Sequence, residues 1–494
     1  MSVPLSPEIP FGEWLPDIGA YNGGLTDAKN CIGYDVTYGP VKSLVSSSNA
    51  MTGKCLGSYA MRSSSGVVHV FAGTATKLYK LNGSSWDDVT NISADYTTAA
   101  DGYWVFTNFG DLVIATNYND DIQVFDVSSS TDFTDLSATA PRARFVFVLN
   151  NFLVCLDTVD SDGAIGNRVR WSPLGDPQGN WTPSISTQAG FNDLFGGGFK
   201  NTAGTGTDSY GTILQDSGIW RMQYVGGDSI FQFDLQVQDR GTVYPRSVTT
   251  NGELSYFIDI DGLCAFNGTG VINIGENKIN RWFFDNFNSS YAYNMSASID
   301  PVNKLYALAF PTVDNGSPDS ALVLLYNYKS GKFTYLEQAL DVIFGFLTVG
   351  YTLDTLSAAY PNIETVPYSL DSTFWQGGDF LFGAIDADGK LGVFSGQPYT
   401  AILATPEARL NPSGKATICG LFPILEQGTV EARIGTREKL TDNVSYTDWQ
   451  GQNSITNEID IMINARFTRA EFEFSGDWDN AKAYAYRLKM GGIV

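Results

Sequence analysis

The sequence predicts an all-β protein: a β-propeller of six or seven blades followed by a C-terminal β-sandwich. Three observations predict this. Helical periodicity is nearly absent from the 494 residues, a short turn-and-strand pattern recurs about every 40 to 50 residues, and the acidity falls away after Ala401. We therefore expect an N-terminal segment at 1–40, an acidic propeller at 41–401 and a C-terminal sandwich or platform domain at 402–494.

The recurring pattern is a pair of turn residues followed by alternating apolar positions. It begins at Thr76, Asp120, Asp216, Asp261, Asn303 and Asp388. Asp162-Gly163 falls in the first double gap. A four-stranded blade cannot bury both faces alone and must stack on neighbours, which produces such a degenerate period. A pair of packed sandwiches is the competing fold, since irregular turn spacing fits it too.

One helix and three further strands can be placed by their apolar spacing. Ile279, Trp282 and Phe283 fall at i, i+3 and i+4, which predicts about two helical turns within 276–286. Apolar residues alternate with polar ones in three segments near the C-terminus, 429–435, 469–474 and 484–488. Half-buried antiparallel strands of this kind predict the small C-terminal sandwich.

The strongly negative net charge of the chain bears on which kinds of molecule it can bind. Fifty-three acidic residues against 30 basic ones give −23, and 402–494 contains 12 acidic and 10 basic residues, so the first 401 residues carry −21. Such a surface repels a phosphate backbone, which argues against ordinary nucleic-acid binding. The N-terminus does not read as a secretion signal and the longest apolar run, 342–349, is too short to cross a bilayer. We expect a soluble cytoplasmic chain with no membrane partner.

Residues for catalysis or cofactor binding are scarce. The five cysteines are widely spaced and are expected to be buried free thiols. His69 is the only histidine, which excludes a His-rich zinc site. A Ser-His-Asp set around it is formally possible, but its apolar neighbours favour a strand histidine. The glycine-rich run 196–206 lacks the ending of a phosphate-binding loop and is expected to be a mobile loop.

The stretch Asp259-Ile260-Asp261-Gly262 places its glycine too early for a calcium loop and is interpreted as a turn. We therefore expect no metal, no cofactor and no catalytic residue, so that the protein is not an enzyme. The enzymatic alternative is a soluble propeller glycoside hydrolase, because paired carboxylates at the mouth of a propeller can act as acid and nucleophile. A carbohydrate-binding propeller is a further alternative.

Four groups of short motifs follow one another along the chain. They are 12–17 with 30–34, then 168–183, then 238–247 with 257–268 and 274–284, and finally 434–437 with 464–469 and 477–478. Together they resemble the tail nozzle or tail hub (tail tubular) proteins of short-tailed bacteriophages. Twelve residues in them are candidates for structural motifs or interfaces: Trp14, Pro16, Asp17, Trp171, Trp181, Asp239, Arg240, Gly241, Pro245, Arg246, Arg466 and Arg469.

Simple physical roles can be assigned to these candidates. Trp171 and Trp181 flank two prolines and suit an aromatic pair that clamps a rigid turn. Asp239, Arg240 and Arg246 suit either a buried or interface ion network around a bend at Gly241 and Pro245 or ordinary strand ends. The arginines of the motif at 464–469 suit subunit contacts.

The resemblance implies a homohexameric ring below the portal and adaptor, with one propeller in each subunit, around the channel through which the genome leaves. It places the protein in the virion tail after assembly in the host cytoplasm, beside the adaptor and other tail proteins. Genomic DNA would pass through the lumen without specific binding. An acidic lumen would repel the DNA backbone, and the glycine-rich run would help to close the channel. The alternative is that the acidity only keeps a large surface soluble.

Overall fold

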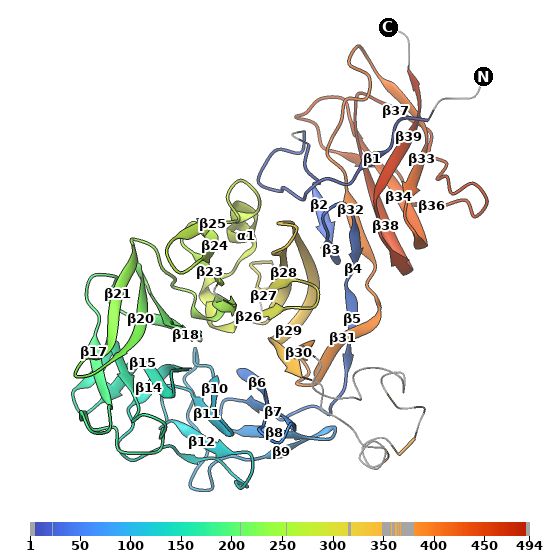
Figure 1. Ribbon diagram of the computed structural model, residues 1–494. Coiled ribbons are helices and arrows are strands. Elements are labelled where there is room, and N and C mark those ends of the chain that lie inside the picture. Colours follow the sequence, from blue (N-terminus) through green and yellow to red (C-terminus); the bar gives the residue numbers. More distant parts are fainter. Residues whose placement is uncertain are drawn as a thin grey trace.

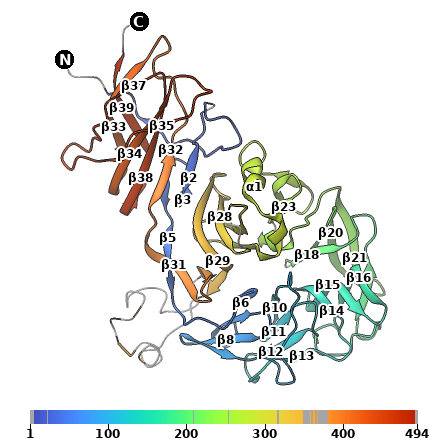
Figure 2. The same ribbon diagram turned by 180° about the vertical axis from the view of Figure 1, so that it is seen from behind.

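The computed structural model describes residues 5–490 apart from 22, 208, 253, 315–317 and most of 348–379, where only 357, 361, 362, 364 and 366 are described. Strands dominate it, and most of them form a ring of small antiparallel sheets (Figure 1). The predicted all-β propeller is confirmed. The same ring is seen from behind in Figure 2.

Five blades are separate four-stranded sheets. Blade 1 consists of β6 (Gly57–Arg62), β7 (Val68–Gly73), β8 (Leu78–Asn82) and β9 (Ser85–Asp88), and blade 2 of β10 (Val105–Phe109), β11 (Leu112–Thr116), β12 (Gln123–Asp126) and β13 (Thr134–Asp135). Blade 3 consists of β14 (Arg142–Leu149), β15 (Phe152–Asp160), β16 (Gly163–Trp171) and β17 (Gly190–Asp193), and blade 4 of β18 (Asn201–Gly206), β19 (Gly211–Gln215), β20 (Gly218–Gly226) and β21 (Ile230–Gln238). Blade 5 consists of β22 (Thr249–Asn251), β23 (Leu254–Asp259), β24 (Gly262–Phe266) and β25 (Val271–Asn273).

Two more blades share one long strand. Blade 6 consists of β26 (Ser296–Asp300), β27 (Leu305–Pro311), β28 (Ser320–Asn327) and the first half of β29 (Phe333–Leu347). Blade 7 consists of the second half of β29 with β30 (Phe380–Asp386), β31 (Leu391–Pro398) and β5 (Lys42–Ser46). The pairing of β29 changes from β28 to β30 at Leu340. The described strands therefore form seven blades.

The N-terminal strand of the propeller closes the ring. Val393 of β31 pairs with Val45 of β5, so the last blade takes its outer strand from the start of the chain. Strand β29 also contacts β6 of the first blade. Closure ties together two segments almost 350 residues apart in sequence.

The recurring sequence pattern marks the same strand in most blades but not in all of them. It falls on the third strand in blades 1 to 5 and in blade 7, namely β8, β12, β16, β20, β24 and β31. In blade 6 it falls on the second strand, β27, because the tight turn there follows Asp300 and precedes the second strand instead of the third. Neighbouring residues thus determine the turn and the strand that follows it, but they do not determine which strand of the blade this is.

The C-terminal strands form two sheets, both of which include strands from the N-terminal segment. One consists of β1 (Ile9–Pro10), β39 (Ala483–Met490), β33 (Ala416–Ile424) and β37 (Ile463–Ala465). The other contains β2 (Asp27–Lys29), β32 (Ala401–Ala404), β38 (Phe467–Asp479) and β34 (Gln427–Arg437), with β35 (Ser445–Tyr446) and β36 (Gln450–Gly451) on β34. Their facing side chains are buried, for example Phe472 against Tyr484 at 5.4 Å between ring centroids.

A hairpin and three short helical elements complete the described fold. The hairpin is β3 (Cys31–Gly33) with β4 (Tyr38–Pro40), and the helical elements are η1 (Pro245–Ser247), α1 (Asn280–Asn286) and η2 (Ser289–Asn294). The helix predicted within 276–286 is confirmed as α1. Its one buried side chain, Phe283, faces the core.

The glycine-rich run is not a loop over its whole length. Residues 201–206 form β18, the first strand of blade 4, so the prediction of a mobile loop is wrong for them. The reason is close packing against blade 3: a Cβ on Gly204 would lie 2.6 Å from Leu156, and one on Gly206 would lie 2.1 Å from the Val148 carbonyl oxygen. Glycine here permits the approach of two blades.

The cysteines are free thiols, four of them buried, with Cys419 half-buried. Burial raises the pKa of the four buried thiols, which are Cys31, Cys55, Cys155 and Cys264. The prediction of buried free thiols is therefore confirmed for these four, whereas Cys419 is only half-buried.

Candidate functional site

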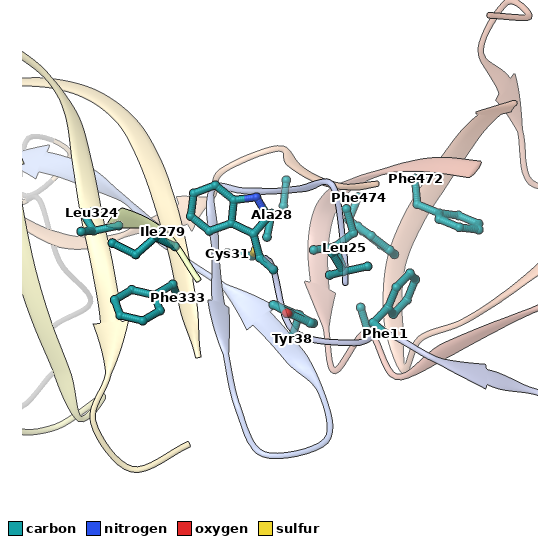
Figure 3. Packing of buried hydrophobic residues seen from close by; sticks show 14 of the residues in the cluster. Phe11, Leu25, Ala28, Cys31, Tyr38, Ile279, Leu324, Phe333, Phe472 and Phe474 are labelled. Carbon is teal, nitrogen blue, oxygen red and sulfur yellow. The ribbon is translucent and has the colours of Figure 1, made fainter. Parts of the chain in front are cut away.

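The N-terminal segment lies between the propeller and the C-terminal sheets, and we call this region the joint (Figure 3). One continuous core runs through it, from Leu324 and Phe333 of blade 6 past Tyr38 to Phe472 of β38. Lys29 of β2 also pairs with Tyr335 of β29, so the sheet of blade 6 continues into a C-terminal sheet. The joint therefore connects the two parts by both apolar packing and backbone pairing.

Two predicted motif residues build the joint. The Trp14 indole is 1% exposed, 4.8 Å from the Trp282 ring and 5.3 Å from the Tyr335 ring, measured between centroids. The Asp17 carboxylate accepts hydrogen bonds of 2.8 Å from the backbone N–H groups of Arg281 and Trp282. Those two groups belong to the first turn of α1, where they have no partner within the helix. Asp17 thus caps a helix 264 residues away in sequence, and Pro16 lies in the turn just before it.

Trp171 and Trp181 do not form an aromatic pair. Trp171 packs against Phe231 at 5.2 Å, in the core between blades 3 and 4, while Trp181 is buried in the core between blades 2 and 3. The Trp181 indole N–H donates to the Pro177 carbonyl oxygen at 2.9 Å. The turn is therefore held by one tryptophan, and the prediction of a clamp by two is wrong because their side chains point to different faces of the blade.

The ion network around the bend differs from the prediction. Arg240 pairs with Asp259 at 3.0 Å and with Asp261 at 2.9 Å, which are the two carboxylates of the predicted turn. Asp239 is exposed and has φ of 63°, outside the network. The Asp-x-Asp-Gly stretch is thus an arginine-bound hairpin turn. Among the described residues no group of three or more His, Cys, Asp or Glu could hold a metal ion.

Arg246 lies elsewhere, at the centre of the propeller. Its Nη1 donates to the carbonyl oxygens of Leu56 at 3.2 Å and Tyr293 at 3.1 Å, and its guanidinium lies 4.9 Å from the Tyr103 ring centroid. Burial lowers its pKa. Pro245 starts η1, and Arg246 follows it in the same turn. Gly241 is required before it, because a Cβ there would lie 2.0 Å from the Gln215 carbonyl oxygen.

The sequence did not single out an ion cluster centred on the buried Arg168. Arg168 on β16 is 6% exposed and bonds Asp193 at 2.7 Å, Asp162 at 2.7 Å and Asp160 at 3.2 Å. Arg170 bonds Asp160 at 2.8 Å. Burial acts against ionisation of Asp160, but the N–H of Asp162 and the two guanidinium groups outweigh it, and the pKa of Asp160 is lowered. The sequence feature that could have revealed this cluster is the alternation Arg168-Val169-Arg170 after an acidic turn. In a strand this alternation places both arginines on one face.

The two C-terminal candidates differ in exposure. Arg466 is exposed between β37 and β38. Arg469 is partly buried, 3.8 Å from Glu471 and 5.1 Å from the Tyr446 ring centroid. Partners within the chain thus occupy Arg469, whereas Arg466 is open to solvent.

Among the described residues, the single histidine forms no Ser-His-Asp arrangement with the nearby Ser64 and Asp111. In its surroundings, Ser64 donates directly to Asp111, both from its hydroxyl and from its N–H at 2.7 Å. A nucleophilic serine would instead donate to the histidine. Burial lowers the pKa of His69, and the positive charge of the nearby Lys80 lowers it further.

A buried carboxyl near the propeller centre gives a pH prediction. Asp341 accepts a hydrogen bond of 2.9 Å from the Cys55 N–H, and burial raises its pKa from 3.8 to about 6. Because this pKa is higher in the folded state, the ionised carboxyl costs stability, and the loss develops as pH rises from about 4 through 6. The difference corresponds to about 3 kcal/mol. Burial also raises the pKa of Asp27 to about 6, so two carboxyls act in this window.

Ionisation of Asp27 and Asp341 together lowers the stability of the fold as pH rises. We expect Asp341→Asn to remove about half of this combined loss, because an amide keeps the acceptor oxygen and carries no charge. Urea unfolding of variant and wild type at pH 4.5 and pH 7.5 measures it: the variant should gain relative to wild type at the higher pH. Asp285→Asn, at a carboxyl that is 67% exposed, is the control and should not gain. Parallel pH curves for Asp341→Asn and wild type would contradict the prediction.

Comparisons with known proteins match no protein family and no curated protein. Solved structures that resemble the chain include a chain of the mitotic checkpoint complex, at 10% identity over 72% of this chain and 94% of that chain, with a TM-score of 0.37. The AfRom2 CNH domain matches at 7% identity over 71% and 97%, and the Neurospora crassa Pan2 WD40 domain at 6% over 69% and 88%, each with a TM-score of 0.38. No described helix is long and apolar enough to cross a membrane. The seven-bladed propeller is assigned from the strand pairing itself.

Proposed function

We propose that this protein is a structural subunit of a phage tail nozzle or hub, a homohexameric ring below the portal and adaptor through which the genome leaves. It works by assembly and conduction, without catalytic turnover, in the virion tail after assembly in the host cytoplasm. The proposal starts from the four groups of motifs that resemble such proteins.

The observation that carries the proposal is the joint. Its residues from the first motif, Trp14 and Asp17, bind propeller residues of the third motif, Trp282 and Arg281, across more than 260 residues. One apolar core continues from blade 6 through this segment into both C-terminal sheets. A ring subunit needs its parts fixed relative to one another, since closure of a ring depends on a constant angle between neighbours. The joint supplies that rigidity.

The distribution of charge supports the conduction part of the proposal. The first 401 residues carry −21 of the net −23, so the acidity belongs to the propeller and the segment before it. Carboxylates around a lumen would repel passing phosphates and keep the DNA from adhering. Adaptor and other tail proteins would then bind elsewhere on the subunit.

The size of the purified assembly tests the proposal. Native mass spectrometry and negative-stain electron microscopy should show a ring of six copies of the 53.7-kDa chain, alone or after addition of its adaptor protein. Arg466→Glu should weaken the ring if this exposed arginine contacts a neighbour. Arg281→Glu is the matched control, at an arginine that is 80% exposed and paired only with Asp285.

Other outcomes would redirect the interpretation. A chain that stays a monomer or dimer with and without adaptor, and that cleaves or binds a glycan, would replace the hub by the carbohydrate-active alternative. A ring whose channel wall is neutral or basic would keep the hub but reject the repulsive lumen.

A further inference from the structure

A cavity of about 290 Å³ lies on the axis of the propeller. It is lined by the inner strands of different blades, among them Tyr59 of β6, Phe106 of β10, Phe145 of β14, Thr205 of β18, Ser296 of β26 and Phe344 of β29. Because its wall comes from around the ring, its shape is fixed by the packing of the blades. The volume is at the lower end of the range for small-molecule sites.

Among the described residues that line this cavity, Arg246 is the only charged one. The buried arginines Arg168 and Arg170 are paired with Asp160, and the half-buried Arg437 is paired with Glu407. Arg221 is half-buried like Arg246, forms no ion pair among the described residues and lies over the Tyr210 ring. Arg246 forms no ion pair among the described residues. Its described hydrogen bonds go to two neutral carbonyl oxygens and use only Nη1, which leaves Nη2 and Nε available.

The Arg246 side chain is half-buried, and it places an uncompensated positive charge in the wall of the cavity. Charged groups removed from bulk water are normally compensated by a counter-ion. One described carboxyl, Asp341, acts electrostatically on Arg246, but it accepts a hydrogen bond from the Cys55 N–H and forms no ion pair with Arg246. Although the chain has a net charge of −23, the Arg246 guanidinium in the cavity wall therefore has no carboxylate as an ion-pair partner among the described residues.

Three hydroxyl groups without partners line the same cavity. Ser58 Oγ, Tyr103 OH and Thr205 Oγ1 are buried and make no hydrogen bond within the described part of the chain. Tyr103 is 9% exposed, and its ring lies beneath the Arg246 guanidinium. Buried hydroxyls are normally satisfied, so three orphans in one cavity indicate an acceptor that fills it.

We infer that this cavity binds a small oxyanion, of the phosphate, sulfate or carboxylate class. Water could satisfy the three hydroxyls but would leave the charge of Arg246 uncompensated. An oxyanion does both, because its oxygens accept from the planar guanidinium and from several hydroxyls at once. The site stands independently of the proposed role in a phage tail.

Isothermal titration calorimetry on the full chain tests the site, with sodium phosphate, sodium sulfate and sodium malonate as separate probes. Sodium chloride at matched ionic strength is the reference for general salt effects. We expect saturable binding of one ion per chain by at least one probe, and the ranking of phosphate against malonate identifies the ligand class.

Two variants locate the binding. Tyr103→Phe keeps the ring beneath Arg246 and removes only the orphan hydroxyl, so the Kd should rise about 3- to 10-fold without loss of folding. Arg246→Lys keeps the charge but loses the planar fork, and the Kd should rise at least about 10-fold. Arg240→Lys, outside the cavity and paired with Asp259 and Asp261, is the control and should bind as wild type.

The inference is overturned if no probe binds beyond the chloride reference, or if all variants bind as wild type, which would mean adventitious surface binding only. Should Arg246→Lys fail to fold, the double variant Ser58→Ala/Thr205→Val replaces it. It removes two hydroxyls that hold no partner in the described structure, so it should fold and bind more weakly.

Discussion

Trp14→Ala is expected to lower the free energy of unfolding by about 3 to 5 kcal/mol, as for other large aromatic side chains removed from a core. Trp14 is 1% exposed and contacts Trp282 and Tyr335, so truncation leaves a cavity between the N-terminal segment and blade 6. Urea unfolding followed by far-UV circular dichroism measures the loss. Limited proteolysis should also cut the variant near its N-terminus sooner than wild type, because the joint is loosened.

The matched control is Phe199→Ala. Phe199 is an aromatic residue that is 90% exposed, so its removal should change stability by no more than about 0.5 kcal/mol. If Trp14→Ala unfolded at the same urea concentration as Phe199→Ala and resisted protease equally, the joint would contribute nothing to the rigidity that the proposed function requires.

Arg168→Met should be the second strongly destabilising substitution, with a loss of about 3 to 5 kcal/mol at pH 7. Methionine fills a similar volume, but it leaves Asp160 and Asp193 without the guanidinium that now bonds both carboxylates. Asp160 is 6% exposed, so its charge is poorly hydrated once a partner is removed. Differential scanning calorimetry or urea unfolding at pH 7 measures the loss.

The pH dependence distinguishes lost charge pairing from lost packing in Arg168→Met. In wild type the pKa of Asp160 is lowered, so its contribution is present above the ordinary carboxyl pKa and disappears as pH falls through the folded value. In the variant that pKa should rise, and the gap to wild type should narrow as pH decreases from 7 to 5. Arg281→Met, at an arginine 80% exposed, should change little at either pH. An equal gap at both pH values would attribute the loss to packing.

The local part of the fold could be predicted from the sequence because it is encoded at short range. The turns before β8, β12, β20, β24 and β31 and the alternation in β34, β38 and β39 follow from neighbouring residues. The helix α1 follows from three apolar positions at helical spacing. Turn residues and apolar repeats of 2 or 3.6 residues are properties of segments of about five to ten residues. They can therefore be recognised in the sequence before the packing partners of the segment are known.

Partners across the chain could not be predicted in this way. The sequence grouped Asp239, Arg240 and Arg246 by proximity, yet Arg240 binds a hairpin turn of blade 5, Asp239 is exposed and Arg246 lies on the propeller axis. Trp171 and Trp181 were paired for the same reason and lie in separate cores. Successive side chains along a bent segment point in different directions, so closeness in sequence does not imply contact.

By itself, the sequence determined that the chain is all-β, that its blades repeat and that its acidity lies before residue 402. Only the tertiary structure decided that β5 completes the seventh blade, that Asp17 caps α1 from 264 residues away, and that three orphan hydroxyls meet Arg246 in one cavity. The physical reason is that strands and turns are selected by local conformational preference, whereas ring closure, capping and the axial cavity depend on which distant surfaces pack together. Those choices depend on burial and complementarity summed over the whole propeller.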